Sequence, residues 1–472
     1  MKKALLTLSV LTLAGIAFAQ VRNIDVSKEC PHYFVDANGK AFIPIGVNLV
    51  RIAPGKNAAE SERNVKEYER WLDEFAANGG NWMRIWLSGG QFEVMPETAG
   101  VFDPKADAVI RRVVSQCERL GIRIKMTLVH HRSFFAKDSE SAQPWANCTV
   151  YSPYVKWWKD FYLNDKCNEI FFARVEHLKS LGLDDSPAVA CWEPCNEISA
   201  SAFVNDYAPW SDMVLAKLQT MFPRQMVTQN LGSYSGPTAF FKYQQMAGVN
   251  ANSFMQIHRY LDPGAQFDVC RGPMDVMAAE SIREMLELRP DRPAVLAETG
   301  AVEANHAGPS ALYSIDRQGV LMHDLVFAPF FAGSAASGML WHWDCYIDRN
   351  HLWYHFGRFA KAIEGLDPIA EDFKPFRTET RRIRIYGLRG RKTTVVWCRD
   401  KDSDWRTELG QRIAPSIVHD ERLPFDKTDF TYYLPWENRT VTSKEPVLPD
   451  FKRSIVARFP TDLQYAHIIE PH

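Results

Sequence analysis

Short apolar runs alternate with longer segments of helical periodicity from about residue 41 onward. Apolar residues three or four positions apart, as in Val65, Tyr68, Leu72 and Phe75, predict helices with one buried face. The runs between such helices are rich in β-branched and aromatic residues, which is typical of buried parallel strands. We predict strands at Phe42–Val47, Asn81–Trp86, Ile122–Val129, Ala188–Trp192, Gln225–Gln229, Ser253–His258, Ala294–Ala297 and Gly338–Trp343.

The order of these elements predicts the fold class. A helix opens at Asp103–Pro104, which supply the N-cap and the first helical position, and ends at Gly121. Eight strands with helices between them, over about 330 residues, fit a (β/α)8 TIM barrel. A glycine-rich phosphate-binding fingerprint does not follow the first strand, which argues against an open dinucleotide-binding sheet.

The pattern changes after about Lys374. Four runs there are short, β-branched or aromatic, and separated by turns: Arg382–Leu388, Thr393–Cys398, Phe430–Leu434 and Ser454–Phe459. They predict a small C-terminal all-β sandwich. We therefore divide the chain into a signal peptide at 1–19, a catalytic (β/α)8 barrel at 20–373 and a β-sandwich domain at 374–472.

The first residues have the features of a secretory signal peptide. Lys2 and Lys3 precede an apolar run, and Ala17–Ala19 supplies a small-x-small cleavage site before Gln20. We expect an exported protein, periplasmic or extracellular. A later apolar run of about 18 residues, the length that a membrane helix needs, does not occur, so the mature form is expected to have no membrane partner.

Composition and charge narrow the partners. The 472 residues include 55 Lys and Arg and 57 Asp and Glu, and both signs are spread along the chain, which argues against a nucleic-acid partner. The nine cysteines are an odd number without CxxC spacing, so we expect buried thiols and no metal site. Cys191 and Cys195 on one strand would lie about 13 Å apart, beyond the roughly 7 Å limit of a disulfide. The oligomeric state stays open.

Two carboxylates carry the strongest chemical signal. Glu197 ends the motif Cys191–Glu197, after the fourth strand, and Glu298 lies in Ala297–Gly300, after the seventh. Carboxyl ends of barrel strands converge on one mouth. Glycoside hydrolysis needs such a pair, one a protonated acid and the other an ionised nucleophile or base.

On these residues the chain resembles the retaining glycoside hydrolases of clan A, the group that includes family 5 cellulases and mannanases. The resemblance covers the whole barrel. In that clan an Asn–Glu pair ends strand 4 and a single Glu ends strand 7. The resemblance therefore implies that Glu197, after Asn196, is the acid/base and that Glu298 is the nucleophile.

The resemblance also implies residues around the substrate. Arg84 matches an arginine near the nucleophile, and His258 and Tyr260 match a His-x-Tyr motif whose tyrosine bonds the nucleophile. Of the two tryptophans in Trp341–Trp343, Trp341 is preferred as the aromatic floor. The expected substrate-binding residues are Asn48, Arg84, His130, Asn196, His258, Tyr260 and Trp341. The expected partner is a carbohydrate, and the chemistry uses no metal and no cofactor.

The physics agrees with these roles. An ionised Glu298 close to Glu197 favours the protonated form of Glu197 until the glycosidic bond breaks. Once Glu298 is glycosylated its charge is gone, and Glu197 can act as the base that activates water. Asn196 can bond the sugar 2-hydroxyl. We expect the two carboxyl groups to lie about 5 to 5.5 Å apart.

Other readings stay open. A metal-dependent barrel hydrolase could use His130, His131 and His258, but Gly46–Asn48 stands where such enzymes carry paired histidines. A non-catalytic carbohydrate-binding barrel is the third, and the intact carboxylate pair argues against it. Mannan or glucan is the first guess for the substrate, and a galactose- or xylose-based glycan is the alternative.

Several residues have two interpretations. Glu193 is read as structural, while His131 and His342 either pack or touch substrate. The Arg132–Asn164 segment is an insertion after the third strand and contains Trp145, Trp157 and Trp158. It is expected to build the substrate face and to decide between internal and terminal cleavage. In the β domain three tryptophans could stack on sugars, although a structural role is favoured. They are Trp397, Trp405 and Trp436, and the charged Arg399–Trp405 loop can reach the barrel mouth.

Overall fold

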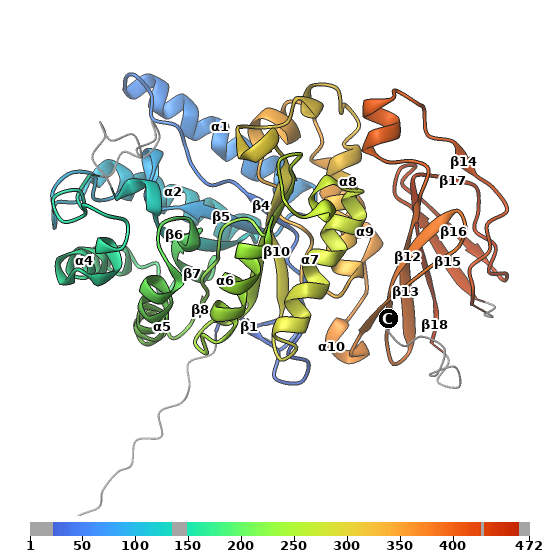
Figure 1. Ribbon diagram of the computed structural model, residues 1–472, viewed down its shortest axis with the longest axis horizontal. Helices are drawn as coiled ribbons and strands as arrows, with labels where there is room; N and C mark the ends of the chain where they lie inside the picture. The colour runs from blue at the N-terminus through green and yellow to red at the C-terminus, as the bar shows by residue number, and fades with distance from the viewer. Residues whose placement is uncertain (1–21, 135–148, 426–428, 462–472) are drawn as a thin grey trace, which may run out of the picture.

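The computed structural model describes residues 22–134, 149–425 and 429–461. These residues form a barrel of strands wrapped by helices and, beside it, an antiparallel sheet that ends the described chain (Figure 1). The predicted signal peptide at 1–19 and Trp145 lie outside the described residues. Within these three ranges, every helix is too short or too polar to cross a bilayer.

Parallel strands follow the chain order around the barrel. Five form the sheet β4-β5-β6-β7-β8, and β9 pairs with β10. Two contacts join these sheets into a closed ring. Between β8 and β9 the Ser253 amide donates to the Val227 carbonyl at 2.9 Å, and between β10 and β4 Leu340 bridges both strands. The predicted (β/α)8 barrel is confirmed, with its eighth strand reduced to residues around Leu340. The strands are β4 (Gly46–Asn48), β5 (Trp82–Trp86), β6 (Arg123–His130), β7 (Val189–Asn196), β8 (Met226–Val227), β9 (Met255–Leu261) and β10 (Ala294–Ala301).

The first predicted strand, Phe42–Val47, is wrong in its extent. The barrel strand begins only at Gly46, whereas Ala41–Phe42 forms β3 of a separate antiparallel sheet. Pro44 lies between them and has no amide hydrogen to donate to a strand ladder. The other strands of that sheet are β1 (Ile24–Val26) and β2 (Phe34–Asp36).

This N-terminal sheet closes the lower end of the barrel. The ring of Phe34 lies 6.4 Å from that of Trp82 and 5.4 Å from that of Phe254. Trp82 begins β5 and Phe254 immediately precedes β9, so the contacts lie where barrel strands start. The opposite end, where the strands finish, is left open for the site.

Helices cover the outside of the barrel, and the helix predicted to open at Asp103–Pro104 has the expected caps at both ends. The Asp103 side chain accepts from the Lys105 amide at 2.9 Å, and Gly121 ends the same helix at a φ of 73°. The helices are α1 (Ala58–Ala77), α2 (Pro104–Leu120), α3 (Asp160–Leu163), α4 (Asp165–Ser180), α5 (Val204–Met221), α6 (Pro237–Ala247), α7 (Met274–Leu288), α8 (Val320–Phe331), α9 (Tyr354–Ala362) and α10 (Pro368–Glu371).

The C-terminal part is an antiparallel sheet with the strand order β11-β12-β13-β18-β15-β16. One face packs on the barrel, where the Trp397 ring lies 6.0 Å from that of Phe327 in α8. The other face forms its own core with the short β14–β17 pair, so the second layer of the predicted sandwich is small. The strands are β11 (Lys374–Glu379), β12 (Ile383–Arg389), β13 (Thr393–Asp400), β14 (Ile417–Val418), β15 (Phe430–Leu434), β16 (Arg439–Ser443), β17 (Phe451–Lys452) and β18 (Ser454–Pro460).

The tryptophans of this sheet support its structural reading. Trp397 is fully buried against α8. The Arg453 guanidinium lies 4.1 Å from the centre of the Trp436 ring, and His323 lies 4.7 Å from it. Next to Trp405, Arg406 donates to the Gly272 carbonyl at 3.0 Å, so the charged loop reaches the segment between β9 and α7.

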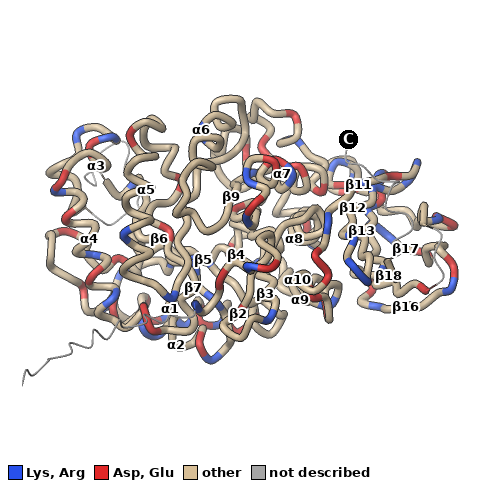
Figure 2. Tube along the Cα trace, turned by 90° about the horizontal axis from the view of Figure 1, so that it is seen from below, with Lys and Arg blue, Asp and Glu red and all other residues tan. Residues whose placement is uncertain are grey.

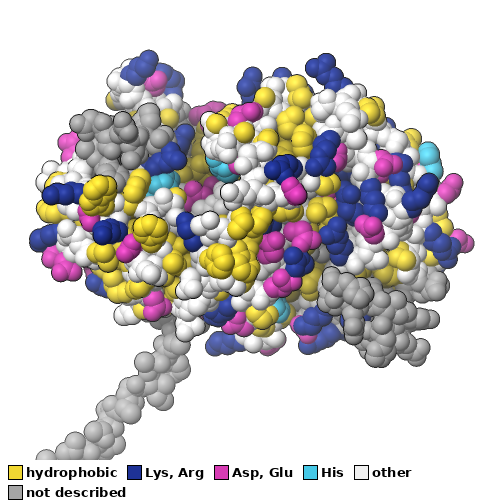
Figure 3. All heavy atoms as spheres, viewed as in Figure 1, with side chains coloured by type: hydrophobic (Ala, Val, Ile, Leu, Met, Phe, Trp, Pro, Cys, Tyr) yellow, Lys and Arg dark blue, Asp and Glu magenta, His cyan; other side chains and the backbone are white. Residues whose placement is uncertain are grey.

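Charged residues of both signs are distributed over the barrel and the sheet (Figure 2). A space-filling view shows the same mixture on one face, with histidine and acidic side chains close together at its upper edge (Figure 3). This distribution agrees with the near balance of 55 basic and 57 acidic residues.

Candidate active site

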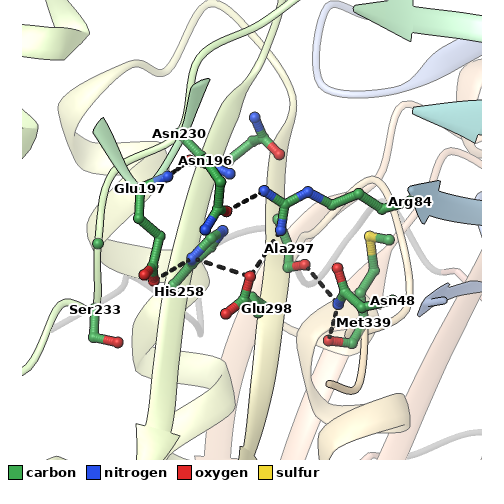
Figure 4. Close-up of polar contacts among 12 residues, drawn as sticks. Asn48, Arg84, Asn196, Glu197, Asn230, Ser233, His258, Ala297, Glu298 and Met339 are labelled. Carbon is green, nitrogen blue, oxygen red and sulfur yellow. Dashed lines mark hydrogen bonds and ion pairs between the residues drawn. The ribbon is translucent and has the colours of Figure 1, made fainter. Parts of the chain in front are cut away.

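The two predicted carboxylates meet at the open end of the barrel. Glu197 directly follows β7, and Glu298 lies in β10 (Figure 4). One oxygen of each carboxylate lies within 4.8 Å of the other and of a ring nitrogen of His258. An oxygen–oxygen separation of at most 4.8 Å agrees better with the roughly 5 to 5.5 Å between the carboxyl groups of a retaining pair than with the roughly 6.5 to 9.5 Å of an inverting pair.

Glu298 is held from two sides. Arg84 Nη1 donates to Oε2 at 2.7 Å, and the Tyr260 hydroxyl donates to Oε1 at 2.7 Å. Burial raises the pKa of Tyr260 well above its usual value, so the hydroxyl stays a donor. A β-bulge between Leu296 and Glu298 shifts the register of β10 against β9 and re-aims the carboxylate. These contacts hold the Glu298 carboxylate in one orientation at the pocket floor.

Glu197 has a different environment. Its φ of 46° and ψ of 49° lie in the left-handed region, which costs a non-glycine residue about 1 to 2 kcal/mol. Its amide donates to Asn230 Oδ1 at 2.6 Å, and that bond helps to hold the turn. The side chain is 22% exposed, against 6% for Glu298. The turn thus directs the more accessible carboxyl group into the mouth.

A buried ionic network lies under the pair. Glu193 accepts from Arg84 Nε at 3.0 Å, Lys125 Nζ at 2.9 Å and the Thr127 hydroxyl at 2.7 Å. Burial alone would raise the pKa of Glu193, but Arg84 and Lys125 hold it at about 2. The structural interpretation of Glu193 therefore agrees with these contacts. Arg84 bonds both Glu193 and the predicted nucleophile Glu298.

A pocket of about 500 Å³ opens over the two carboxylates. It is lined by six of the predicted site residues: His130, Asn196, Glu197, Tyr260, Glu298 and Trp341. It is also lined by residues that were not predicted as site residues, among them Arg51, Trp86, His306 and Asp344. Trp86 ends β5 just as His130 ends β6, so its position at a strand end was the signal that could have found it.

The remaining aromatic residues of the pocket surround its floor. Trp341 lies 5.0 Å from Trp86, and Trp343 lines the pocket as well. His131 and His342 also line it, so both can touch substrate. Burial lowers the pKa of each of these histidines to about 4, so both are neutral hydrogen-bonding groups near neutral pH.

Three predicted substrate-binding residues lie behind the pocket. Asn48, expected to bind the sugar, does not line the pocket: its Nδ2 donates to the carbonyls of Ala297 at 3.1 Å and Met339 at 3.0 Å, which ties β4 to β10 and to the shortened eighth strand. Arg84 and His258 are fully buried and contact the glutamates from below. They position the carboxylates and do not line the pocket.

Comparison with solved structures places this architecture among known proteins. The chain superposes on a glycoside hydrolase with a TM-score of 0.61 and 12% identity, covering 95% of this chain and 98% of that one. It superposes on a family 5 glycoside hydrolase from Bacteroides vulgatus ATCC 8482 with a TM-score of 0.57 and 12% identity, covering 94% of this chain and 95% of that one. A family 5 mannosidase from Rhizomucor miehei superposes with a TM-score of 0.51 and 13% identity, covering 68% of this chain and 85% of that one. The chain has the fold of the family 5 glycoside hydrolases.

Sequence comparison does not reach this family 5 likeness. No model of a protein family matches the sequence. No curated protein matches it either. The two larger structural likenesses cover well over nine-tenths of the chain, so they include most of the C-terminal sheet as well as the family 5 barrel.

The metal-dependent alternative loses its ligand set. It required His130, His131 and His258 together, but among the described residues the convergent His, Cys, Asp and Glu side chains are Glu197, His258 and Glu298. His131 Nδ1 faces the Asn196 carbonyl at 3.3 Å instead. His258 Nδ1 lies 3.0 Å from Glu197 and 3.5 Å from Glu298, as a bridge between the two carboxylates.

Replacing Arg84 by lysine is expected to lower kcat by roughly 10²-fold, the cost of displacing a reacting group by about 1 Å. Lysine keeps the positive charge but lacks the fork that holds Glu298 and Glu193 at once. Arg259→Lys is the matched control, because Arg259 is equally buried but bonds Glu284 away from the pocket. Steady-state rates and melting temperatures of both variants check this, and near-normal turnover of Arg84→Lys would mean that Arg84 only packs.

Proposed function

We propose that this chain is a retaining β-glycosidase that acts by double displacement. The observation that supports this most directly is the carboxylate pair, with one oxygen of each within 4.8 Å and with unequal surroundings. Glu298 is buried and bonded to Arg84, as a nucleophile that must stay ionised requires. Glu197 is more exposed and can reach the oxygen of a leaving group.

In the first step Glu298 attacks the anomeric carbon as the bond to the leaving oxygen breaks. Glu197 gives its proton to that oxygen, so the departing group leaves as a neutral alcohol. Arg84 and Tyr260 keep the attacking carboxylate oriented. Asn196 Oδ1 accepts from Arg84, which leaves the Asn196 NH2 group to donate to the sugar 2-hydroxyl.

In the second step a water molecule replaces the leaving group. Glu197 is now a carboxylate, takes a proton from that water, and the oxygen attacks the anomeric carbon. The ester bond to Glu298 breaks and the carboxylate returns to its place against Arg84. Two inversions at the same carbon give a product with the configuration of the substrate.

A β-mannan or β-glucan is the proposed substrate class. The pocket combines tryptophan rings, which offer apolar faces to a sugar, with neutral histidines that can bond hydroxyls. The likeness to a family 5 mannosidase makes mannose-based substrates the first to test. We also propose that the protein is exported, which rests on the N-terminal pattern of residues 1–19.

Hydrolysis of β-linked mannan and glucan oligosaccharides is expected to release the β-anomer first, with the α-anomer appearing only by later mutarotation. Proton NMR at early times measures this directly. Glu298→Gln serves as the control, because it keeps the shape of the site but removes the nucleophile. Initial release of the α-anomer would refute retention. Binding without cleavage would indicate a carbohydrate-binding barrel, and loss of activity with a chelator a metal-dependent hydrolase.

A further inference from the structure

Four charged side chains lie together in the barrel core, three of them below the pocket and Glu298 at its floor. We call them the charge quartet: Arg84, Lys125, Glu193 and Glu298. Each has at most 6% of its side chain exposed. Arg84 bonds both carboxylates, at 3.0 Å to Glu193 and 2.7 Å to Glu298. Of the two carboxylates, Lys125 bonds Glu193 alone, at 2.9 Å, and Lys125 does not line the pocket.

The quartet holds two positive and two negative charges and is therefore neutral as a whole. Glu193 divides its oxygens between the cations, with Oε1 facing Arg84 and Oε2 facing Lys125. Charges in a buried site act on one another with little screening by water. Removing one of the two outer members, Lys125 or Glu193, must leave a net charge next to Arg84 and hence next to Glu298.

On the basis of the proposed function, we propose that Lys125 and Glu193 are positioning residues that set the pH range in which Glu298 is ionised and Glu197 protonated. Neither Lys125 nor Glu193 lines the pocket, so neither is placed to contact the substrate. They act through Arg84, which joins Glu193 to Glu298. Because the charges of Lys125 and Glu193 cancel, the pair adds no net charge next to Glu298 and Glu197.

The charged or titratable groups that act on Lys125 among the described residues come from three neighbouring strands. They are Arg84 on β5, Cys191 and Glu193 on β7, and His258 on β9. Burial raises the pKa of the Cys191 thiol far above its usual value and lowers that of His258 to about 4, so both are neutral at pH 7. Gln256, also on β9, bonds both Lys125 and Glu193 and carries no charge.

Among Lys125 and the groups that act on it, Lys125 is the one whose pKa lies close to neutral pH. Burial lowers the pKa of Lys125 to about 8, although Glu193 partly opposes the shift. Above that pH the lysine loses its proton, and the quartet acquires a net negative charge. Substituting a neutral residue for Lys125 should therefore reproduce this state at every pH.

Three variants test the proposal by the direction in which they move the pH profile of kcat/KM. Lys125→Met removes a positive charge, so both carboxyl groups protonate more readily and both limbs move to higher pH. Glu193→Gln removes a negative charge, so both limbs move to lower pH. Each displacement is expected to be about one pH unit, a tenfold change in rate at a fixed pH on the flank. The double variant Lys125→Met/Glu193→Gln is neutral again and should return both limbs to their wild-type positions.

The measurement uses the full chain and a β-linked oligosaccharide that the wild type cleaves, because its alcohol leaving group needs the proton of Glu197 and both limbs of the profile are then visible. Lys66→Met is the control, because Lys66 lies on the surface of α1 with 68% of its side chain exposed, and it should leave the profile unchanged. Melting temperatures record any loss of packing. If Lys125→Met alone does not fold, Glu193→Gln and the double variant still test the sign of the shift.

Opposite shifts in the single variants with restoration in the double variant would support the proposal. Unchanged limbs in the single variants, or equal losses of rate at every pH, would overturn it and leave a packing role. These outcomes are separate from failure of the proposed function, because a wild type that cleaves no glycoside would refute that function before any variant is compared.

Discussion

Replacing Glu298 by alanine is expected to lower turnover by about 10⁴-fold or more, since it removes the group that attacks the anomeric carbon. The fold should be retained, because Arg84 keeps its bonds to Glu193 and Asn196 when Glu298 is removed. Azide can enter the space left by the carboxylate and attack once from the nucleophile's side. The product is then a glycosyl azide of inverted configuration, which NMR identifies.

Glu197→Ala is the matched partner of this experiment and should give the opposite stereochemistry. An aryl glycoside with a good leaving group needs no proton, so the glycosyl–enzyme still forms. Its hydrolysis is slow because the base is missing. Azide needs no base, so it should restore turnover and give a glycosyl azide with the configuration of the substrate.

The two variants together distinguish the roles of the two glutamates. The assignment requires inversion from Glu298→Ala and retention from Glu197→Ala, with the same aryl glycoside and the same azide concentration. The same azide anomer from both variants, or full activity in either, would contradict it. Ser233 lies near the two glutamates in Figure 4, and its hydroxyl bonds His306 instead of either of them. Ser233→Ala therefore serves as a further control for a substitution close to the site.

Removing Asp324 is expected to destabilise the folded protein by about 3 to 5 kcal/mol, because it leaves a buried arginine without its anion. Arg399 of β13 donates to Asp324 of α8 through Nε at 2.7 Å and Nη2 at 3.1 Å, and both side chains are 1% exposed. This ion pair joins the C-terminal sheet to the barrel. Denaturant unfolding of Asp324→Ala measures the change in the free energy of unfolding.

The double variant Asp324→Leu/Arg399→Met separates the loss of a partner from the value of the pair. Replacing both charges by apolar side chains of similar size removes the unpaired charge, so most of the stability should return. Glu287→Ala breaks the exposed pair with Arg283 and should change little. A small effect of Asp324→Ala would mean that Arg399 is satisfied by backbone carbonyls, including that of Arg453 at 3.0 Å.

Local sequence determined much of the barrel. The buried face of α1 and the caps of α2 follow from residues only a few positions apart, so periodicity and capping chemistry were enough to predict them. Glu197 and Glu298 were found because each comes at the end of a β-rich run, and strand ends of a barrel share one mouth. The resemblance to family 5 enzymes added Tyr260, and the hydroxyl does bond Glu298.

Tertiary structure decided what each side chain contacts behind that mouth. Asn48 was expected to meet the sugar but ties β4 to carbonyls 249 and 291 positions away, because the eighth strand is too short to close the barrel by its own ladder. Lys125 looks like any lysine in the sequence. Its burial beside Glu193, 68 positions away, exists only once β6 and β7 are paired in register. Local pattern fixes which residues point inward, whereas barrel closure and strand register fix which of those inward residues meet.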